Sequence, residues 1–298
     1  MFLDFSKQFP TRAFSVIGSL LLSALSFASP QKSNTPPIVP TAPLLTRTSA
    51  RHEVRRFGYG GTLTIIGAPR GSITIEGWNK SEVDISAEVE LQAPTEEDLE
   101  RLAIVNTFVF DEDANHLSLI ATGTHDKIFM KRVAKDFPKR LLGLPWKIDY
   151  RIRVPALTDV EVNAGDGAIK LSGVEGAIRV SGRQTDATLT LTGGTVSVTV
   201  ATGTVNVTLP TRSWRGAGLE VQLAAGELNV EMPAGFNGDI DADVLRNGKI
   251  DNSYPSFETR ERPGITARTI KARVGAGGAK LKFAVVDGTI TIKKRSDE

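Results

Sequence analysis

The sequence predicts an all-β protein, a β-solenoid or a closely related stack of short strands, with one short α-helix and one basic insert. Two observations predict it. Val, Ile, Leu, Thr and Gly recur in short alternating runs while aromatic residues make up 6% of the 298 residues, which is typical of strands joined by tight turns. The second is a near-repetition, GAIKLSGVEGAIRVSG, between Gly167 and Gly182. Hydrophobic residues, at 40%, are enough for a sizeable core.

Units of this kind continue toward the C-terminus, most often nine residues apart. Each has the form Gly-x-apolar-x-apolar-x-Gly, which fits a five-residue strand followed by a glycine corner. One unit alone cannot bury its apolar side, so we expect the units to coil on one another with the same residues inward. The apolar centres are Ile169, Ile178, Leu189, Val196, Val205, Leu219, Leu228, Ile240, Ile250, Leu281 and Ile290.

The N-terminus has the three-part layout of a secretory signal peptide. Lys7 and Arg12 precede the apolar run Ala13–Ala28, which ends in the small residues Ser26 and Ala28. The run is short for a bilayer span, so cleavage after Ala28 is predicted, and an uncleaved anchor is the alternative. The chain has no cysteine, which suits a bacterial envelope protein better than a small disulfide-bonded domain. We therefore predict export to the periplasm, the cell surface or the exterior.

Four segments follow from these patterns. Residues 1–28 are the signal peptide, and residues 29–54 are a Pro-rich tether, because five prolines between Ser29 and Pro43 favour extended chain. Residues 55–154 form an N-terminal β region that carries the helix and the insert. Residues 155–298 hold the glycine-punctuated repeats, continuous with the preceding region.

The helix is predicted near residues 95–105. Thr95 is a favoured cap, three acids follow it, and Leu99 and Leu102 have helical spacing. Near residues 127–147 the strand alternation stops and prolines interrupt the chain. A basic loop with a short amphipathic helical turn is expected there.

Several stretches resemble the bacterial putative adhesin family, which comprises exported domains of unknown function with a β-solenoid-like fold. The matching stretches are GTLTIIGAPRGSITIEGWNKSEVDISAEVE, YRIRVPALTDVEVNAGDGAIKLSGVEGAIRVSG and GGAKLKFAVVDGTITIKKR. The resemblance spans roughly Arg55 to Arg295 and implies an adhesin-like role at the cell surface. The basic insert is longer than the usual loop of the family.

The search for catalytic motifs finds none. No serine lies in a Gly-x-Ser-x-Gly elbow, HEVRR lacks the second histidine of a zinc protease, and no phosphate-binding loop is present. We therefore predict no enzyme activity, no catalytic residues, no cofactor and no metal. The alternative is a polysaccharide-processing enzyme with acids and bases on an outer face, and the residues considered for it are Asp166, Asp251, Lys170, Arg179 and Arg183.

Two further groups are candidate metal ligands by residue type, but their spacing does not fit a metal site. His52, His116 and His125 are scattered without ligand spacing. Asp239, Asp241 and Asp243 alternate along one strand, and their carboxylates would lie about 6.5 to 7 Å apart, too wide for one ion. A solvated acidic stripe is the expectation for these three aspartates.

Charge is unevenly distributed in the first half of the chain. Eleven acids and one base lie between Ser81 and Asp113, whereas nine bases and three acids lie between His125 and Val154. The basic insert also holds apolar residues, so it either contacts an anionic partner or packs as a cap over the end of the stack. The predicted partner contacts are Lys131, Arg132, Lys139, Arg140 and Trp146.

These inferences predict an exported, non-enzymatic interaction module that binds through repetitive β faces. The partner classes are a cell-envelope glycan, an anionic membrane surface or an envelope protein, and the sequence leaves the choice open. Nucleic acid is excluded as a partner, because an exported chain rarely meets it and no aromatic-interleaved basic motif is present. An envelope-stress regulatory component is a further alternative, and the oligomeric state stays open.

Overall fold

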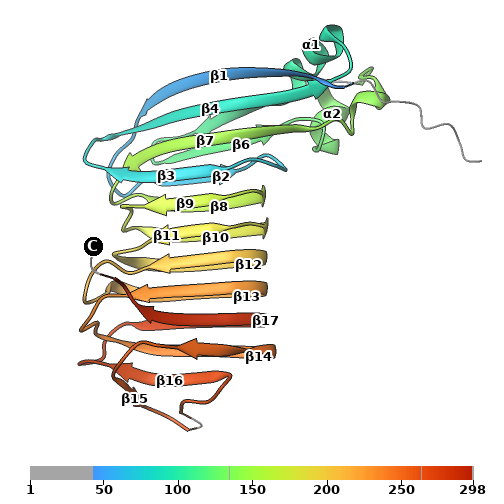
Figure 1. Ribbon diagram of the computed structural model, residues 1–298. Helices are drawn as coiled ribbons and strands as arrows, with labels where there is room; N and C mark the ends of the chain where they lie inside the picture. The colour runs from blue at the N-terminus through green and yellow to red at the C-terminus, as the bar shows by residue number, and fades with distance from the viewer. Residues whose placement is uncertain (1–42, 134, 263, 297–298) are drawn as a thin grey trace, which may run out of the picture. The chain divides into compact units, whose positions relative to one another are not determined.

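The computed structural model describes residues 43–133, 135–262 and 264–296 (Figure 1). The predicted signal peptide and most of the predicted tether lie outside the described residues. Within them, strands dominate, and the two α-helices and one 3-10 turn are confined to one region. The all-β prediction is confirmed.

The strands are hydrogen-bonded into one continuous sheet. Their bounds are as follows. They are β1 (Leu45–Arg56), β2 (Thr62–Ile66), β3 (Ile73–Trp78), β4 (Glu82–Ala93), β5 (Thr107–Glu112), β6 (His116–Thr122), β7 (Trp146–Pro155), β8 (Asp159–Asp166), β9 (Ile169–Ser172), β10 (Ala177–Gln184), β11 (Ala187–Thr190), β12 (Gly193–Thr208), β13 (Arg215–Met232), β14 (Gly238–Asn252), β15 (Phe257–Thr259), β16 (Thr269–Val274) and β17 (Lys280–Lys294). The helical elements are α1 (Glu96–Val105), α2 (Lys127–Val133) and the 3-10 turn η1 (Lys139–Leu141).

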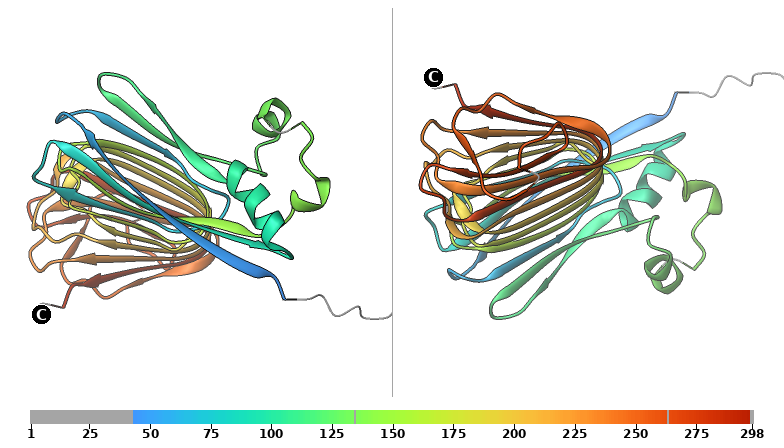
Figure 2. Two further views of the ribbon diagram at one scale, coloured as in Figure 1. Left: turned by 90° about the horizontal axis from the view of Figure 1, so that it is seen from above. Right: turned by 90° about the horizontal axis from the view of Figure 1, so that it is seen from below.

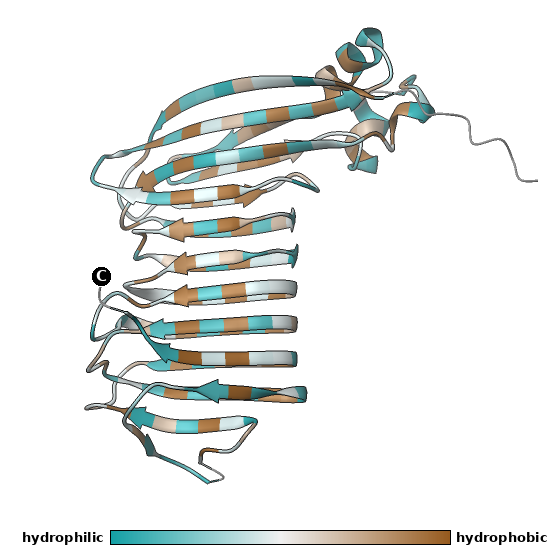
Figure 3. Ribbon diagram, viewed as in Figure 1, coloured by the Kyte–Doolittle hydropathy of each residue, from teal (hydrophilic) through white to brown (hydrophobic). Residues whose placement is uncertain are grey.

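Period-two alternation explains why these segments are strands. In β7, Ile148, Tyr150 and Ile152 are buried, and the residues between them are polar and at least partly exposed. Strand β4 has the same pattern. Figure 3 shows the alternation as bands of hydrophobic and hydrophilic colour along each strand. The apolar side of every layer therefore joins one core.

The central strands stack in parallel with their apolar residues in register. Ile178 of β10 pairs with Val160 of β8 on one side and with Val196 of β12 on the other. Ala187 of β11 pairs in the same way with Ile169 of β9 and with a valine of β12. Residues that pair between neighbouring layers are therefore two nine-residue units apart in the sequence. Each layer has two halves joined at a corner, and the long strands β12, β13, β14 and β17 run through both halves.

The C-terminal strand does not lie at the end of the stack. Strand β17 pairs in parallel with β13 on one side and with β14 on the other, so it separates two strands that are neighbours in the sequence. Figure 1 shows it between them. Its five buried residues are Leu281, Phe283, Val285, Ile290 and Ile292.

Both ends of the stack depart from the parallel repeat. At one end β1, β4 and β7 pair antiparallel, as do β5 and β6. At the other end β14, β16 and β15 pair antiparallel. Viewed along the stack, the strands form a curled sheet (Figure 2). The coarser prediction of stacked short strands thus holds, whereas a solenoid is not confirmed.

The tether prediction is wrong for its last part. Residues 45–54, assigned to the tether, belong to strand β1, which pairs with β4 along its whole length. The segment was missed because nearly all of its residues are exposed, so it has no apolar alternation. Charged residues along such an edge strand oppose pairing with another sheet edge.

The helix and the insert are found where the sequence predicts them. Helix α1 begins after Thr95, whose side chain accepts a hydrogen bond from the backbone N–H of Asp98. Leu99 and Leu102 are buried on its inner side. The insert forms α2 and η1, so its predicted helical turn is confirmed.

Candidate functional site

The predicted contact residues have different surroundings in the insert. Lys131 and Arg132 lie on α2 and are exposed, as are Lys139 and Arg140 on η1. Trp146 is the first residue of β7 and is 8% exposed. The first three thus remain accessible, while Arg140 and Trp146 have structural contacts. Whether any of them contacts a partner stays a prediction.

Arg140 ties the insert to α1. Its guanidinium donates to both carboxylate oxygens of Asp98, at 2.5 and 2.7 Å. The Asp98 side chain is 2% exposed. The hydrogen bonds from Arg140 lower the pKa of Asp98 and outweigh the opposing effect of burial. A bidentate pair of this kind holds the two segments in one orientation.

The inner side of the insert packs into the core. Leu141 is fully buried and Met130 is 8% exposed, and Phe137 and Leu144 pack against the core cluster from partly buried positions. The Trp146 ring lies 5.3 Å from the ring of His125. The apolar residues of the insert therefore pack against the core cluster, while capping of the stack end stays a prediction.

We expect Asp98→Asn to loosen the insert at neutral pH. The native pair requires a charged carboxylate. Since the pKa of Asp98 is lowered in the folded protein, the contribution of the pair is fully present above the ordinary aspartate pKa near 3.9 and is lost as the pH falls through the lower folded value. Limited trypsin digestion with mass spectrometry should show several-fold faster cleavage after Lys131 and Arg132 in the variant. Equal cleavage rates in variant and parent at neutral pH would contradict this role.

The predicted acidic stripe is neutralised by cations from neighbouring segments. Asp241 accepts from Arg260 at 2.6 Å and lies 2.9 Å from the ammonium of Lys280. Asp239 pairs with Arg260 and Arg273, and Asp243 pairs with Lys271. Asp241 is also buried, at 7% exposure. The solvated stripe is thus wrong for Asp241, because β17 and the segment around Arg260 fold against β14.

Of the acids and bases considered for an enzyme, the structure pairs one acid with one base but keeps the two carboxylates on different strands. Asp166 ends β8 and pairs with Arg183 at 2.9 Å. Asp251 lies on β14 and pairs with Lys249, and four strands separate β14 from β8. Arg179 faces outward on β10. Within the described ranges, no group of three or more His, Asp or Glu residues has metal-binding geometry.

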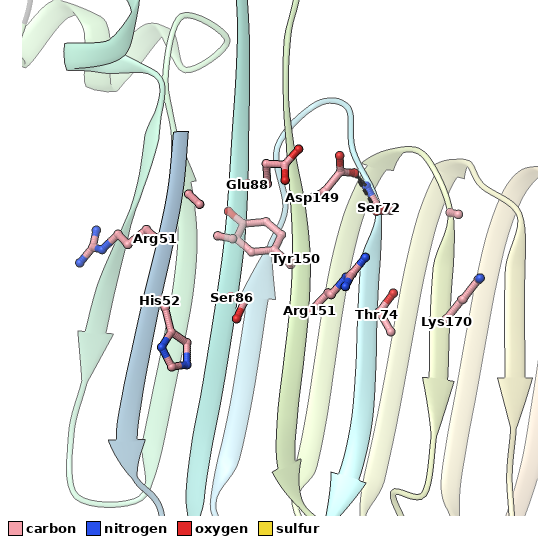
Figure 4. Close-up of a pocket in the computed structure, with 13 residues that line it drawn as sticks. Arg51, His52, Ser72, Thr74, Ser86, Glu88, Asp149, Tyr150, Arg151 and Lys170 are labelled. Carbon is pink, nitrogen blue, oxygen red and sulfur yellow. Dashed lines mark hydrogen bonds between the residues drawn. The ribbon is translucent and has the colours of Figure 1, made fainter. Parts of the chain in front are cut away.

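A groove crosses five strands at the end of the sheet that holds β1, and sequence reasoning did not find it. Its volume is about 650 Å³. Two rows of outward positions run across β1, β4, β7, β3 and β9, in this order (Figure 4). The groove is lined by Ala50, Arg51, His52, Ser72, Thr74, Ser86, Ala87, Glu88, Asp149, Tyr150, Arg151, Ala168 and Lys170.

One of the two rows, called the central row below, holds cations and hydroxyl groups. Thr74 of β3 pairs with Arg151 of β7 on one side and Lys170 of β9 on the other. Figure 4 shows Thr74 between these two side chains. Both cations are exposed, and neither forms an ion pair with another described residue. His52 and Ser86 continue the row across β1 and β4.

The second row contains a carboxylate, that of Asp149, which is hydrogen-bonded within the protein. Asp149 accepts hydrogen bonds from the backbone N–H and hydroxyl of Ser72, both at 2.7 Å, and from the ammonium of Lys147 at 3.0 Å. Burial works to raise the pKa of Asp149, but these hydrogen bonds outweigh it and the net direction is downward. Asp149 therefore stays charged at neutral pH and fixes the floor of the groove beside Arg151.

Comparisons with known proteins find similarity at the level of structure. No protein-family model matches the chain, and no curated protein matches it. A putative cell adhesion protein from Clostridium sporogenes is similar over 83% of this chain and 100% of its own, with 11% identity and a TM-score of 0.41. A putative adhesin from Bacteroides fragilis is similar over 86% of this chain and 99% of its own, with 12% identity and a TM-score of 0.37.

One membrane finding accompanies these comparisons. None of the helices within the described part of the chain is long and apolar enough to cross a bilayer.

Proposed function

We propose that the chain is an exported, non-enzymatic interaction module that binds an extended acidic polymer, such as a cell-envelope glycan, across the groove. The observation that carries the proposal is the row Arg151, Thr74 and Lys170. Two exposed cations without an ion-pair partner among the described residues flank a hydroxyl on three neighbouring strands. Carboxylate or sulfate groups of a polymer suit the cations, and its hydroxyl groups suit Thr74 and Ser86.

The stacked layers extend this row beyond the groove. From Lys170 the register leads to Thr188, then to Asn206 and Asn229. The side-chain amide of Asn229 donates to that of Asn206 at 3.0 Å. In this proposal the layers act as a solenoid, and a polymer lying along the row meets a polar group about every 4.8 Å. Many weak contacts of this kind add up through multivalency.

The groove chemistry favours binding over hydrolysis. Glycoside hydrolysis requires one carboxyl group that holds a proton and one that is charged. The two carboxylates of the groove are Glu88 and Asp149, which lie opposite each other in register. The lowered pKa of Asp149 makes it a poor proton donor and also a weak base. Both of its carboxylate oxygens already accept hydrogen bonds, from Ser72 and Lys147, which disfavours it in the charged role as well.

The test compares the full chain with the double variant Arg151→Ser/Lys170→Ser. The probe is polygalacturonate, with neutral dextran as the uncharged comparison. We expect salt-sensitive binding of polygalacturonate that weakens roughly 30-fold or more in the variant, since two hydrogen bonds to charged groups are lost. The matched control is Arg179→Ser/Arg212→Ser, which removes the same charge from exposed positions outside the groove. Equal weakening in both double variants would overturn the assignment of the groove.

A further inference from the structure

The outer side of the basic insert is a second charged surface with a different composition. We call it the insert face, defined as Lys127, Ile128, Lys131, Arg132, Lys135, Lys139 and Leu142. All seven residues are exposed. None of its five cations forms an ion pair with another residue in the described ranges. Met130 and Leu141 of the same segment are buried instead.

Helix α2 concentrates the cations around one apolar side chain. At about 100° per residue, Lys127, Lys131, Ile128 and Arg132 fall within about 140° of arc, with Ile128 inside that arc. Ile128 is 79% exposed. Met130 lies on the opposite side of the helix and is buried.

We propose that the insert face docks on an anionic lipid membrane surface. Amphipathic helices that lie in the interface combine Lys and Arg with apolar side chains that enter the boundary of the bilayer. Here the cations attract anionic headgroups, and Ile128 and Leu142 enter the acyl boundary. The insert holds seven basic residues and one acid between Lys127 and Lys147, so its charge complements such a surface.

The composition separates this site from the groove. The side chains in the central row of the groove are all polar, which suits a hydrated polymer. The insert face adds two exposed apolar residues to its cations, which a hydrated polymer does not require. The pair of Arg140 with Asp98 fixes the insert against α1, so the insert face is presented in one orientation.

The experiment is vesicle co-sedimentation of the full chain at low and physiological salt. One set of vesicles is pure phosphatidylcholine and the other contains phosphatidylglycerol. The variants are Lys131→Ser/Arg132→Ser, Ile128→Ser and the charge-matched control Arg179→Ser/Arg212→Ser. The apolar run Ala13–Ala28 is present in every variant, so differences between variants report the insert face.

We expect salt-sensitive binding to the phosphatidylglycerol vesicles that exceeds binding to pure phosphatidylcholine. It should weaken roughly 30-fold in the double variant, because each cation near an anionic surface contributes about one factor of five. It should weaken about 10-fold in Ile128→Ser and stay unchanged in the control. Circular dichroism of each variant verifies that the exposed substitutions leave the fold intact.

Two results would overturn the proposal. Equal binding by the double variant and the parent would exclude the insert face as the docking surface. Loss of binding in the double variant with no effect of Ile128→Ser would assign the insert to soluble polyanions instead of a bilayer. The groove variant Arg151→Ser/Lys170→Ser, measured on the same vesicles, should bind normally, so the outcome is independent of the polymer experiment.

Discussion

A chain that ends at Ala279 is expected to lose its cooperative fold. The deletion removes β17, which supplies a strand between β13 and β14 and five core side chains that are at most 1% exposed. At about 1.5–3 kcal/mol for each buried apolar side chain, the lost burial is on the order of 10 kcal/mol, comparable with the whole stability of an ordinary domain. Two sheet edges would also be left unpaired.

Thermal unfolding followed by circular dichroism checks this expectation. The matched control is a chain that ends at Arg295, which keeps β17 and the hydrogen bond from the Arg295 backbone N–H to Met232. The control should melt like the parent, and the chain ending at Ala279 should show no cooperative transition. A cooperative melt of the shorter chain at the parental temperature would show that β17 is an accessory strand.

The second large effect is expected at a stacked corner. Gly226 has φ of 137°, a conformation that side chains disfavour. It pairs with Gly203 in one neighbouring layer and Gly288 in the other. A Cβ on Gly226 would lie 1.9 Å from the carbonyl oxygen of Gly203. Because the backbone cannot move aside as a flexible side chain does, Gly226→Ala should lower the free energy of unfolding by about 4 kcal/mol.

Gly235 provides the matched control for this corner. It also has positive φ, at 70°, but its Cβ would meet no atom within 4 Å. Gly235→Ala should therefore lower the free energy of unfolding only by the conformational strain of the positive φ, about 1 kcal/mol. Urea unfolding of the two variants separates the effects. Equal destabilisation would mean that close approach between layers contributes nothing at Gly226.

The sequence was sufficient for the all-β class and for most of the local elements. Alternating runs specify strands because one side of each is buried, and Thr95 specifies the start of α1 through its hydrogen bond to Asp98. Strand β1 escaped prediction since its residues are almost all exposed. The position of β17 between β13 and β14 could not be predicted, because parallel layers with the same alternation of apolar and polar residues look alike in the sequence. Only the packing decides which layer lies beside which.

The groove could not be predicted for a related reason. Its central row joins His52, Ser86, Arg151, Thr74 and Lys170, which come from five strands in an order unlike the sequence. Polar residues at outward strand positions are expected for solubility alone, so none of them stood out. Lys170 was considered only as a member of an enzyme site with distant acids. The strand register places Thr74 beside Lys170 and Arg151 on the strand beyond Thr74.

The cationic insert was visible from composition, but its internal contacts were not. The five predicted contact residues were chosen for charge and aromatic character. Arg140 pairs with the buried Asp98, and Trp146 lies in the core. Ile128 faces solvent. Composition alone could not predict this, because the position of a residue on α2 decides whether its side chain faces solvent.

The central claim, that the groove binds an acidic polymer, is tested most directly by footprinting lysines with an amine-reactive reagent. The full chain is modified with and without saturating polygalacturonate, and the rate at each lysine is read by mass spectrometry. Lys170 should be protected at least several-fold, while Lys131 on the insert and Lys249 on β14 should react at unchanged rates. Protection of Lys131 with unchanged reaction of Lys170 would contradict the account and move polymer binding from the groove to the insert.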